Sequence, residues 1–198
     1  EKHLDTFIGA SRALVGELNG EAECLVLSTP GTFRHLNADL AMSAVTGVTT
    51  SRVARKQGFA KKLTAQLIAA DAAEGALVSA LGIFEQGFYN LLGFGYAPYE
   101  QWISFDPAQL NVNVKARVPR RLSPDDAAQI HHALIHRQRL HGACSLLPPE
   151  IIASELGQHS KDFGLGYFDG PKGELTHFFY ASTKSGSGPY TIHFMVYQ

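Results

Sequence analysis

The amino-acid sequence predicts an α/β protein made of two consecutive units. In the first half, segments typical of strands are interrupted by one long and one short helix. In the second half, two helices precede three segments typical of strands. Residues 108–119 follow neither pattern, so we place a first unit at 1–108, a linker at 109–116 and a second unit at 117–198. The chain of 198 residues, 45% of them hydrophobic, is long enough for one large or two small cores.

In the first unit, the residue types predict the order strand, strand, helix, strand, helix, strand. Val, Thr and Leu dominate the first two strands, and the Pro-Gly and Asn-Ala-Asp sequences between them are typical of turns. The long helix is predicted by Phe59, Leu63 and Leu67, which recur at helical spacing, and Gly75 is its expected C-cap. Gly93 ends the short helix. The expected elements are the strands 22–29, 41–51, 76–83 and 100–107 and the helices 56–74 and 85–98.

The second unit begins with a strong helix start. Ser123 is a typical N-cap, Pro124 suits the first helical position, and Asp125 and Asp126 follow in the first turn, where carboxylates favour the helix dipole. We expect Gly142 to end this helix as a C-cap. A second helix follows Pro148 and Pro149, and the expected strands are 164–170, 173–183 and 190–198, with a hairpin loop at 184–189.

Composition and charge limit the classes of partner. The formal net charge is −1, without the basic excess of a nucleic-acid-binding domain, so we expect no nucleic acid partner. Two distant cysteines, Cys24 and Cys144, do not make a disulfide framework, which predicts a reducing, cytoplasmic location. No apolar run reaches the about 18–20 residues of a membrane helix, so we expect no membrane partner. The chain starts at Glu1 without a Met and ends inside an expected strand, and we expect it to be a fragment.

The stretch 51–67 has the character of an anion-binding site. Arg55, Lys56, Gln57 and Gly58 lie where an expected strand gives way to the long helix. The first turn of a helix carries unpaired amides and a partial positive charge, and a glycine there lets an anion approach the backbone. Basic residues at this end oppose the helix dipole, at a cost of about 0.3–1 kcal/mol, unless an anion lies beside them. The pattern is neither a Walker loop nor a dinucleotide fingerprint, and a plain helix start with a basic first turn is the alternative.

Two stretches together resemble a known family. "SRVARKQGFA" opens the long helix, and "FYNLLGF" follows downstream. This arrangement resembles the GCN5-related N-acetyltransferase (GNAT) superfamily, and "VTGVTTSRVARKQG" with "EQGFYNLLGFGYAP" is most similar to the enhanced intracellular survival acetyltransferase family. The resemblance is good over residues 41–107 and rests only on the order of elements over 117–198. It implies an acyl-CoA N-acyltransferase fold followed by a degenerate or partial second GNAT-like unit.

The resemblance also implies a cofactor, an acceptor and roles for individual residues. The co-substrate is acetyl-CoA, the acceptor is a small-molecule or peptide amine, and the assembly is a homo-oligomer. Tyr89 matches the tyrosine that acts as general acid toward the CoA thiolate, with direct attack of the amine on the thioester. Glu85, four residues earlier, is a possible support for the acceptor or for acid–base chemistry. The cofactor-binding residues implied by the family are Val48, Thr49, Thr50, Arg55, Lys56, Gln57, Gly58, Phe59 and Ala60.

Several features leave alternatives open. Gln57 stands where the family often has a third basic residue, and Phe84 where it commonly has Ser. Tyr89 has the spacing of a core residue, and Glu85 that of a solvated one. His132 and His136 have the spacing of a two-histidine metal face, but no third ligand is evident, so we expect no metal. We therefore predict an acetyl-CoA-dependent N-acetyltransferase; the alternative is a non-catalytic acyl-CoA-binding or assembly module with the same fold.

Overall fold

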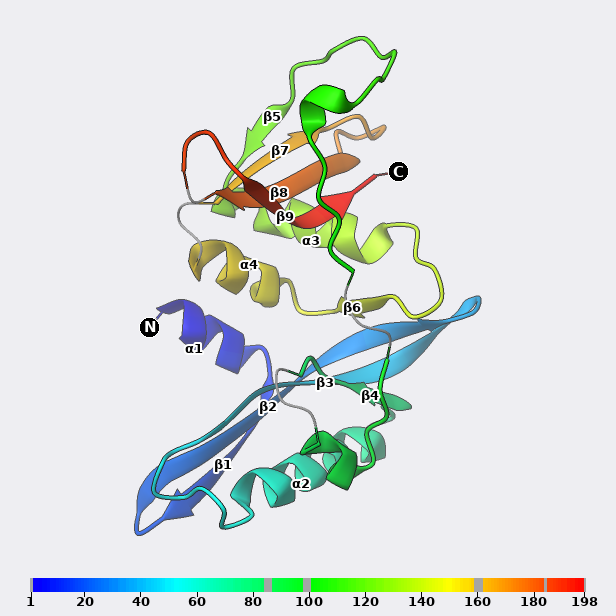
Figure 1. Ribbon diagram of the computed structural model, residues 1–198. Coiled ribbons are helices and arrows are strands. Elements are labelled where there is room, and N and C mark those ends of the chain that lie inside the picture. The colour runs from blue at the N-terminus through cyan, green and yellow to red at the C-terminus, as the bar shows by residue number, and fades with distance from the viewer. Residues whose placement is uncertain (1, 84–86, 98–100, 159–161, 184, 198) are drawn as a thin grey trace.

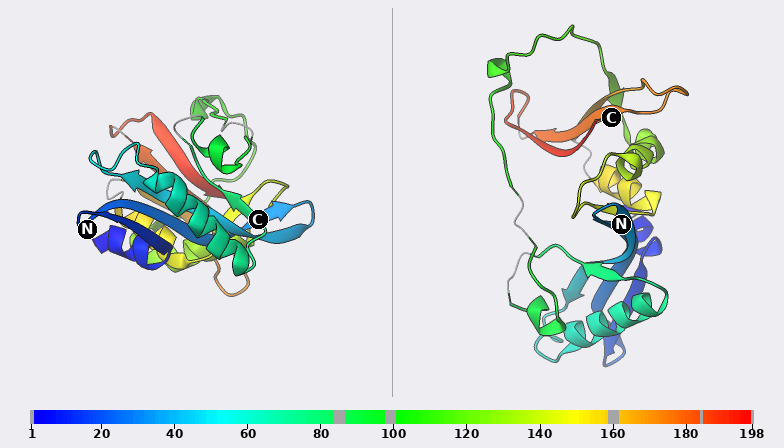
Figure 2. Two further views of the ribbon diagram at one scale, coloured as in Figure 1. Left: turned by 90° about the horizontal axis from the view of Figure 1, so that it is seen from below. Right: turned by 90° about the vertical axis from the view of Figure 1, so that its right-hand side faces the viewer.

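The computed structural model describes residues 2–83, 87–97, 101–158, 162–183 and 185–197. Two β-sheets lie at different levels of the molecule, with three helices, α1, α3 and α4, between them (Figure 1). A fourth helix, α2, covers the outer face of the first sheet (Figure 2). Among the described residues, no helix is both long enough and apolar enough to cross a membrane.

The first half of the chain forms most of the first sheet and its covering helix. Strand β2 is much longer than the expected 22–29, β3 begins three residues before the expected 41–51, and the expected helix 56–74 is confirmed as α2. The elements are α1 (Lys2–Gly9), β1 (Arg12–Leu18), β2 (Glu21–His35), β3 (Ala38–Thr50), α2 (Phe59–Ala73), β4 (Val78–Ala80) and the 3-10 helix η1 (Tyr89–Leu92). Neither α1 nor β1 is predicted by the sequence.

The second half forms the second sheet and contributes one strand to the first. Its elements are η2 (Pro107–Gln109), β5 (Arg120–Leu122), η3 (Pro124–Asp126), α3 (Ala127–His136), β6 (Cys144–Leu146), α4 (Pro149–Gln158), β7 (Phe163–Tyr167), β8 (His177–Thr183) and β9 (Tyr190–Val196). The predicted helix start is confirmed, because Ser123 and Asp126 form a capping box. The second sheet has the order β5-β7-β8-β9, and helices α3 and α4 pack on it through Ile130 and Leu156.

The first sheet has the order β1-β2-β3-β4, antiparallel except for the parallel pair of β3 with β4. The expected turn at Pro30-Gly31 is wrong, because β2 runs through both residues to His35. Strand β6 pairs with this part of β2, opposite Gly31. A Cβ atom on Gly31 would lie 2.7 Å from the carbonyl oxygen of Ser145, so the glycine permits the close approach of β6.

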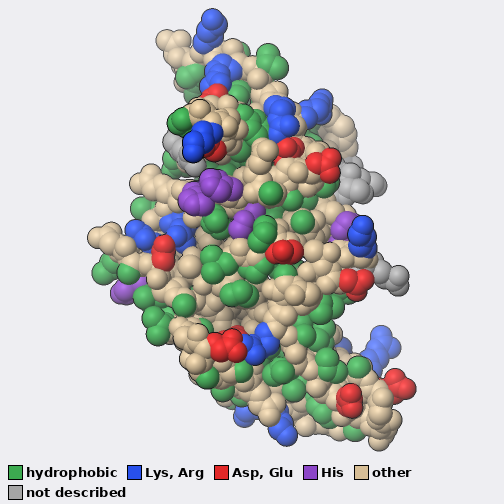
Figure 3. Space-filling model, turned by 180° about the vertical axis from the view of Figure 1, so that it is seen from behind, with side chains coloured by type: hydrophobic (Ala, Val, Ile, Leu, Met, Phe, Trp, Pro, Cys, Tyr) green, Lys and Arg blue, Asp and Glu red, His purple; other side chains and the backbone are tan. Residues whose placement is uncertain are grey.

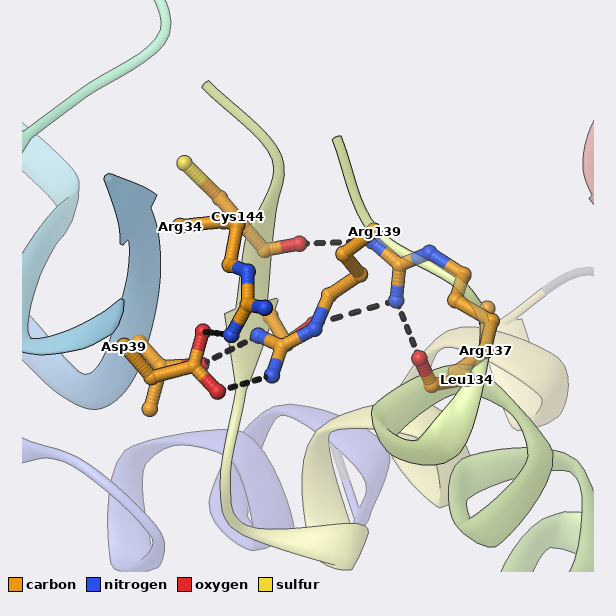
Figure 4. Close-up of polar contacts among 8 residues, drawn as sticks. Arg34, Asp39, Leu134, Arg137, Arg139 and Cys144 are labelled. Atoms are coloured by element: carbon orange, nitrogen blue, oxygen red, sulfur yellow. Dashed lines mark hydrogen bonds and ion pairs between the residues drawn. The ribbon is translucent and has the colours of Figure 1, made fainter. Parts of the chain in front are cut away.

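The two halves of the chain are joined by polar contacts as well as by β6. The hydroxyl of Ser154 on α4 donates to the carbonyl oxygen of His3 on α1 (2.6 Å). Arg139 donates to Asp39 (2.5 Å) at the tip of the β2–β3 hairpin and to Thr32 (2.7 Å). Arg137, whose pKa is lowered by burial and by the charge of Arg139, donates to the carbonyl oxygen of Cys144, next to the same hairpin (Figure 4). The proposed linker at 109–116 between two units stays a prediction. The contacts described above join residues on either side of this linker.

Other expectations need correction. Residues 101–106 form no strand, although 100–107 has the alternation of one. The short helix expected at 85–98 is reduced to η1, which ends at Gly93 as predicted. Gly142 does not cap a helix, because α3 already ends at His136; its amide donates to the carbonyl oxygen of Arg34 (2.8 Å) in the turn before β6.

Candidate functional site

Strands β3 and β4 pair over a short distance and then part. Their parallel ladder stops at the pair Ala44–Ala80, whereas β3 continues to Thr50 with β2 on its other side. Among the described residues, the last part of β3 therefore has no strand neighbour on the β4 side. Val48, Thr49 and Thr50 lie on this edge, which offers backbone hydrogen-bonding groups to an extended ligand.

A β-bulge bends β3 just before this edge. The pairs Leu27–Thr46 and Leu25–Thr49 are two residues apart on β2 and three apart on β3. The extra residue lies at Gly47, whose φ is 54° and whose added Cβ would lie 2.8 Å from a side-chain carbon of Leu27. Only glycine fits this bulge without strain. Gly47 is not among the predicted site residues, although an isolated glycine within a strand pattern is the usual signal of a bulge.

The N-terminus of α2 is open. Its N-cap is Gly58, with φ 82°, and no described side chain caps the helix. A Cβ added to Gly58 would meet no atom within 4 Å. Lys56 also has a positive φ, of 62°, so two left-handed residues curve the backbone around the helix start. The amides of the first helical turn, which include those of Phe59 and Ala60, are thus available to an anion.

The basic and polar side chains before the helix point away from the core. Arg55, Lys56 and Gln57 are all exposed. Gln57 donates from Nε2 to the carbonyl oxygen of Val53 (2.8 Å), which fixes the turn that precedes Gly58. On the face of the molecule shown in Figure 3, Lys and Arg side chains alternate with Asp and Glu and form no continuous basic stripe.

Tyr89 is half-buried at the start of η1. Its ring makes edge contacts with Phe88 (centroids 5.0 Å apart) and Phe94 (6.1 Å). Burial raises the pKa of Tyr89 above its usual value, so the phenol keeps its proton at neutral pH. The turn that follows is tied by Asn90, which donates to the carbonyl oxygen of Phe94 (3.0 Å) and accepts from the Tyr96 hydroxyl (2.6 Å).

A cavity of about 810 Å³ lies beside Tyr89, along β4. Its lining comes from β4 and the residues after it, from the turn at 87–97, and from Phe33 and Ile68. The side chains are mostly apolar or aromatic, including Leu81, Leu92 and Phe94. The cavity has Tyr89 on its wall but none of the nine predicted cofactor-binding residues.

One hydrophobic cluster brings three parts of the candidate site together. Val48 from the free edge of β3 packs against the same buried residues as Phe59 and Ala60 from the first turn of α2. Phe94, which contacts Tyr89, packs against this cluster as well. The shared core thus places the free strand edge, the helix start and the tyrosine around one apolar centre.

Two further candidates have different outcomes. Glu85 and the neighbouring Phe84 lie outside the described residues. His131 is buried, with Nε2 3.2 Å from the carbonyl oxygen of Leu146, whereas His132 and His136 are exposed and their rings stack 4.1 Å apart. The described part of the chain contains no group of three or more His, Cys, Asp or Glu side chains that could hold a metal ion.

Comparison with solved structures gives the fold. A probable N-acyltransferase from Enterococcus faecalis aligns with 99% of this chain at a TM-score of 0.70 and 16% identity. Eis1 from Mycobacterium abscessus aligns with the whole chain (TM-score 0.65, 14% identity), and a GCN5-related N-acetyltransferase from Kribbella flavida aligns with 94% of it (TM-score 0.62, 20% identity). The chain spans 50%, 55% and 47% of these three structures, respectively.

Sequence comparison gives the family. No curated protein has a significant match to this chain. Residues 1–97 match the family model described as acetyltransferase (GNAT) domain, and this range holds the divergent strands, the open helix start and Tyr89. The predicted fold is confirmed, with the acetyltransferase domain followed by a second, partial unit. Residues 1–97 of the chain are therefore similar to the acetyltransferase domain of the GNAT superfamily.

Proposed function

We propose that this chain transfers an acetyl group from acetyl-CoA to an amine, as a relative of the enhanced intracellular survival acetyltransferases. The observation that carries the proposal is the junction of an unpaired strand edge, at Val48–Thr50, with an uncapped helix start at Gly58. An extended molecule that carries amides at one end and a diphosphate at the other is complementary to this junction. Coenzyme A has this chemistry.

The residues present fit this ligand. The open space at Gly58 lets phosphate oxygens reach the amides of residues 56–60, and Arg55 and Lys56 supply positive charge at the rim. The free edge of β3 pairs with the pantetheine amides. Acetyl-CoA supplies the activated thioester. A backbone amide of β3 near Val48 donates to the carbonyl oxygen, which stabilises the negative charge that develops there.

Tyr89 is the proposed general acid. Burial holds its proton at neutral pH, and its ordinary pKa of about 10 is close to that of an alkyl thiol. The neutral amine attacks the thioester carbonyl directly, the carbon–sulfur bond breaks, and the phenol donates this proton to the departing thiolate. The nitrogen of the new amide loses one proton to solvent, and solvent returns a proton to the phenolate, so no net proton is consumed. The cavity of about 810 Å³ beside Tyr89 offers room for the acceptor.

Two measurements, made one after the other, test the proposed acetyl transfer. Isothermal titration calorimetry with acetyl-CoA is expected to give saturable binding at one site per chain. An assay for free CoA thiol over a panel of small-molecule and peptide amines is then expected to show turnover. Absence of binding contradicts the proposal, whereas binding without turnover on any amine favours the alternative of an acyl-CoA-binding or assembly module.

A further inference from the structure

A second, smaller cavity lies in the second half of the chain and shares no described lining residue with the cavity beside Tyr89. Its volume is about 180 Å³, and its walls come from α4, from the residue before β7 and from the adjacent strands β8 and β9. The proposed acetyl transfer assigns no role to these walls. The described residues that line the cavity are Glu155, Leu156, Asp162, Tyr180, His193 and Phe194.

A β-bulge in β9 brings two consecutive side chains to this cavity. Tyr180 of β8 pairs with Phe194, and the next residue of β8 pairs with Ile192, so His193 is the extra residue of β9. Consecutive side chains of a strand normally point to opposite faces, whereas a bulge re-aims one of them. His193 and Phe194 therefore both line the cavity. Nε2 of His193 lies 2.8 Å from the hydroxyl oxygen of Ser182, which fixes the ring.

Two carboxylates give the cavity a negative character. The Asp162 side chain is only 9% exposed, and its Oδ2 lies 3.8 Å from Nε2 of His193. Glu155 is half-buried on α4. Even with His193 protonated, the described lining keeps a net negative charge. A carboxylate has about four acceptor sites, so a further donor can join the contacts that Asp162 and Glu155 already make.

The phenol of Tyr180 is a buried polar group without a partner. Tyr180 is 3% exposed, and its ring packs on Gly164, where an added Cβ would lie 2.5 Å from a ring carbon. No hydrogen bond joins its hydroxyl to another described residue, although Tyr180 lines the cavity. Burial, and then the charge of Asp162, raise the pKa of Tyr180, so the phenol is neutral and lies near that carboxylate. A buried hydroxyl is normally hydrogen-bonded, so an unpartnered one on a cavity wall points to a ligand.

The lining fits a small organic cation better than a metal ion. Within the described part of the chain, no three His, Cys, Asp or Glu side chains could hold a metal ion. A primary ammonium group has three N–H donors, which match acceptor oxygens of Asp162, Glu155 and Tyr180. Leu156 and Phe194 belong to the hydrophobic core of the second half and offer apolar contact to an alkyl chain.

We propose that this cavity is a binding site for a small primary alkylammonium ion. The ammonium group donates to the carboxylates of Asp162 and Glu155 and to the Tyr180 oxygen, and the alkyl chain packs against Leu156 and Phe194. The site serves binding alone. The acetyl transfer proposed above uses none of these residues, so each of the two proposals can fail without the other.

An NMR titration of the isotope-labelled 198-residue chain with n-butylammonium chloride tests the site, at constant ionic strength and without acetyl-CoA. Saturable shifts of the backbone amide signals of residues 155–156, 180 and 193–194 are expected. n-Butanol has the same alkyl chain without the charge and is expected to bind about tenfold more weakly or less. Equal binding of n-butanol overturns the proposal. So do shifts confined to residues 87–97, which would place the amine beside Tyr89 instead.

Single substitutions separate the cavity from the rest of the surface. Asp162→Asn is expected to weaken n-butylammonium binding about 10–100-fold, because it removes a charged acceptor with little change in size. Asp125→Asn, at an exposed carboxylate outside the cavity, is the matched control and keeps the Kd. Tyr180→Phe keeps the ring and is expected to weaken binding about 2–10-fold. An equal Kd in the two Asp variants overturns the site, and if circular dichroism shows that Asp162→Asn does not fold, an unchanged Kd in Tyr180→Phe overturns it.

Discussion

At the scale of single residues, Gly58 is proposed to serve the binding of acetyl-CoA, and Tyr89 the chemical step. Gly58 keeps the start of α2 open by its missing side chain and its left-handed backbone. Tyr89 contributes a proton that burial retains. Substitutions at the two positions are therefore expected to affect different measured quantities.

Gly58→Asp is expected to abolish the rise in melting temperature that acetyl-CoA produces, because the introduced carboxylate repels the diphosphate and fills the cradle. The left-handed backbone costs the unliganded protein about 1 kcal/mol of stability for any non-glycine residue. Thermal shift with and without acetyl-CoA measures both effects. Gly75→Asp is the control at the other end of α2, where φ is 104° and the space is equally open. If both variants keep the ligand-induced rise, the cradle is not the binding site.

Tyr89→Phe is expected to lower kcat by about 10²–10⁴-fold while the Kd of acetyl-CoA stays the same, because only the proton is removed. Steady-state kinetics and calorimetry separate the two quantities. Tyr96→Phe removes the neighbouring hydroxyl, which is bonded to Asn90, and is expected to have a much smaller effect. Equal effects of the two substitutions would exclude Tyr89 as the acid.

The pH profile provides an independent check on Tyr89. The acid is active only while protonated, so its ionisation produces a fall in kcat on the alkaline side. Since burial raises the pKa of Tyr89, the fall assigned to it is expected above the usual tyrosine value of about 10. A fall assigned to Tyr89 that begins below this value contradicts the buried phenol.

At the scale of elements, the C-terminal end of α2 is fastened to the sheet by Asp71. Its carboxylate accepts from Arg12 Nε of β1 (2.7 Å) and from the Ser43 hydroxyl of β3 (2.5 Å). Arg12 also pairs with Glu74, whose side chain is 69% exposed, whereas that of Asp71 is only 13% exposed. Asp71 and Glu74 therefore both pair with Arg12, but the Asp71 carboxylate is largely buried and the Glu74 carboxylate is exposed.

Asp71→Ala is expected to lower the free energy of unfolding by about 1–3 kcal/mol, because it leaves the buried Ser43 hydroxyl without its acceptor and leaves Arg12 with only the exposed Glu74 as partner. Glu74→Ala, which removes an exposed partner of the same arginine, is expected to cost at most about 1 kcal/mol. Urea denaturation measures both. A larger loss for Glu74→Ala than for Asp71→Ala would contradict this assignment.

The elements that the sequence predicts are those whose signals are local. The periodicity of Phe59, Leu63 and Leu67 and the cap at Ser123 depend only on nearby residues. Helix α2 and the helix start at Ser123 form as predicted, although α3 ends at His136, before the expected Gly142. The Pro-Gly pair in β2 has the residue types of a turn but lies inside a strand, and Leu146 of β6, which pairs with Gly31, lies far along the chain. The alternation at 100–107 is real, but a strand needs a neighbour, and the sequence does not show whether one is present.

In the candidate site too, the features that the sequence predicts are local, and the features that it misses depend on distant segments. The glycine at the helix start and the tyrosine in the downstream turn are identified from motifs, although their roles stay predictions. The parting of β3 and β4 depends on pairing between distant segments, and the cavity depends on the packing of the turn at 87–97. Neither leaves a signal in one short stretch of sequence.

At the scale of the whole molecule, Arg139 links the halves. Its side chain is 12% exposed and bridges Thr32 and Asp39 on the hairpin to the segment before β6. Arg139→Ala is expected to lower the free energy of unfolding by about 1–3 kcal/mol, since Asp39 loses its closer partner, and the melting temperature by about 2–4 °C per kcal/mol. Calorimetry is the measurement, and Arg121→Ala, at an exposed arginine of β5, is the control. An equal melting temperature in the two variants would show that the bridge adds no stability.

The position of β6 has a consequence for biosynthesis. β2 and β3 leave the ribosome long before residues 144–146, which border Gly31–Phe33 in the finished sheet. At about 5–20 residues per second, the backbone of β2 stays without this neighbour for several seconds of translation. A nascent chain stalled at residues 109–116 would thus display an unpaired strand edge at Gly31–Phe33, the kind of surface that chaperones engage.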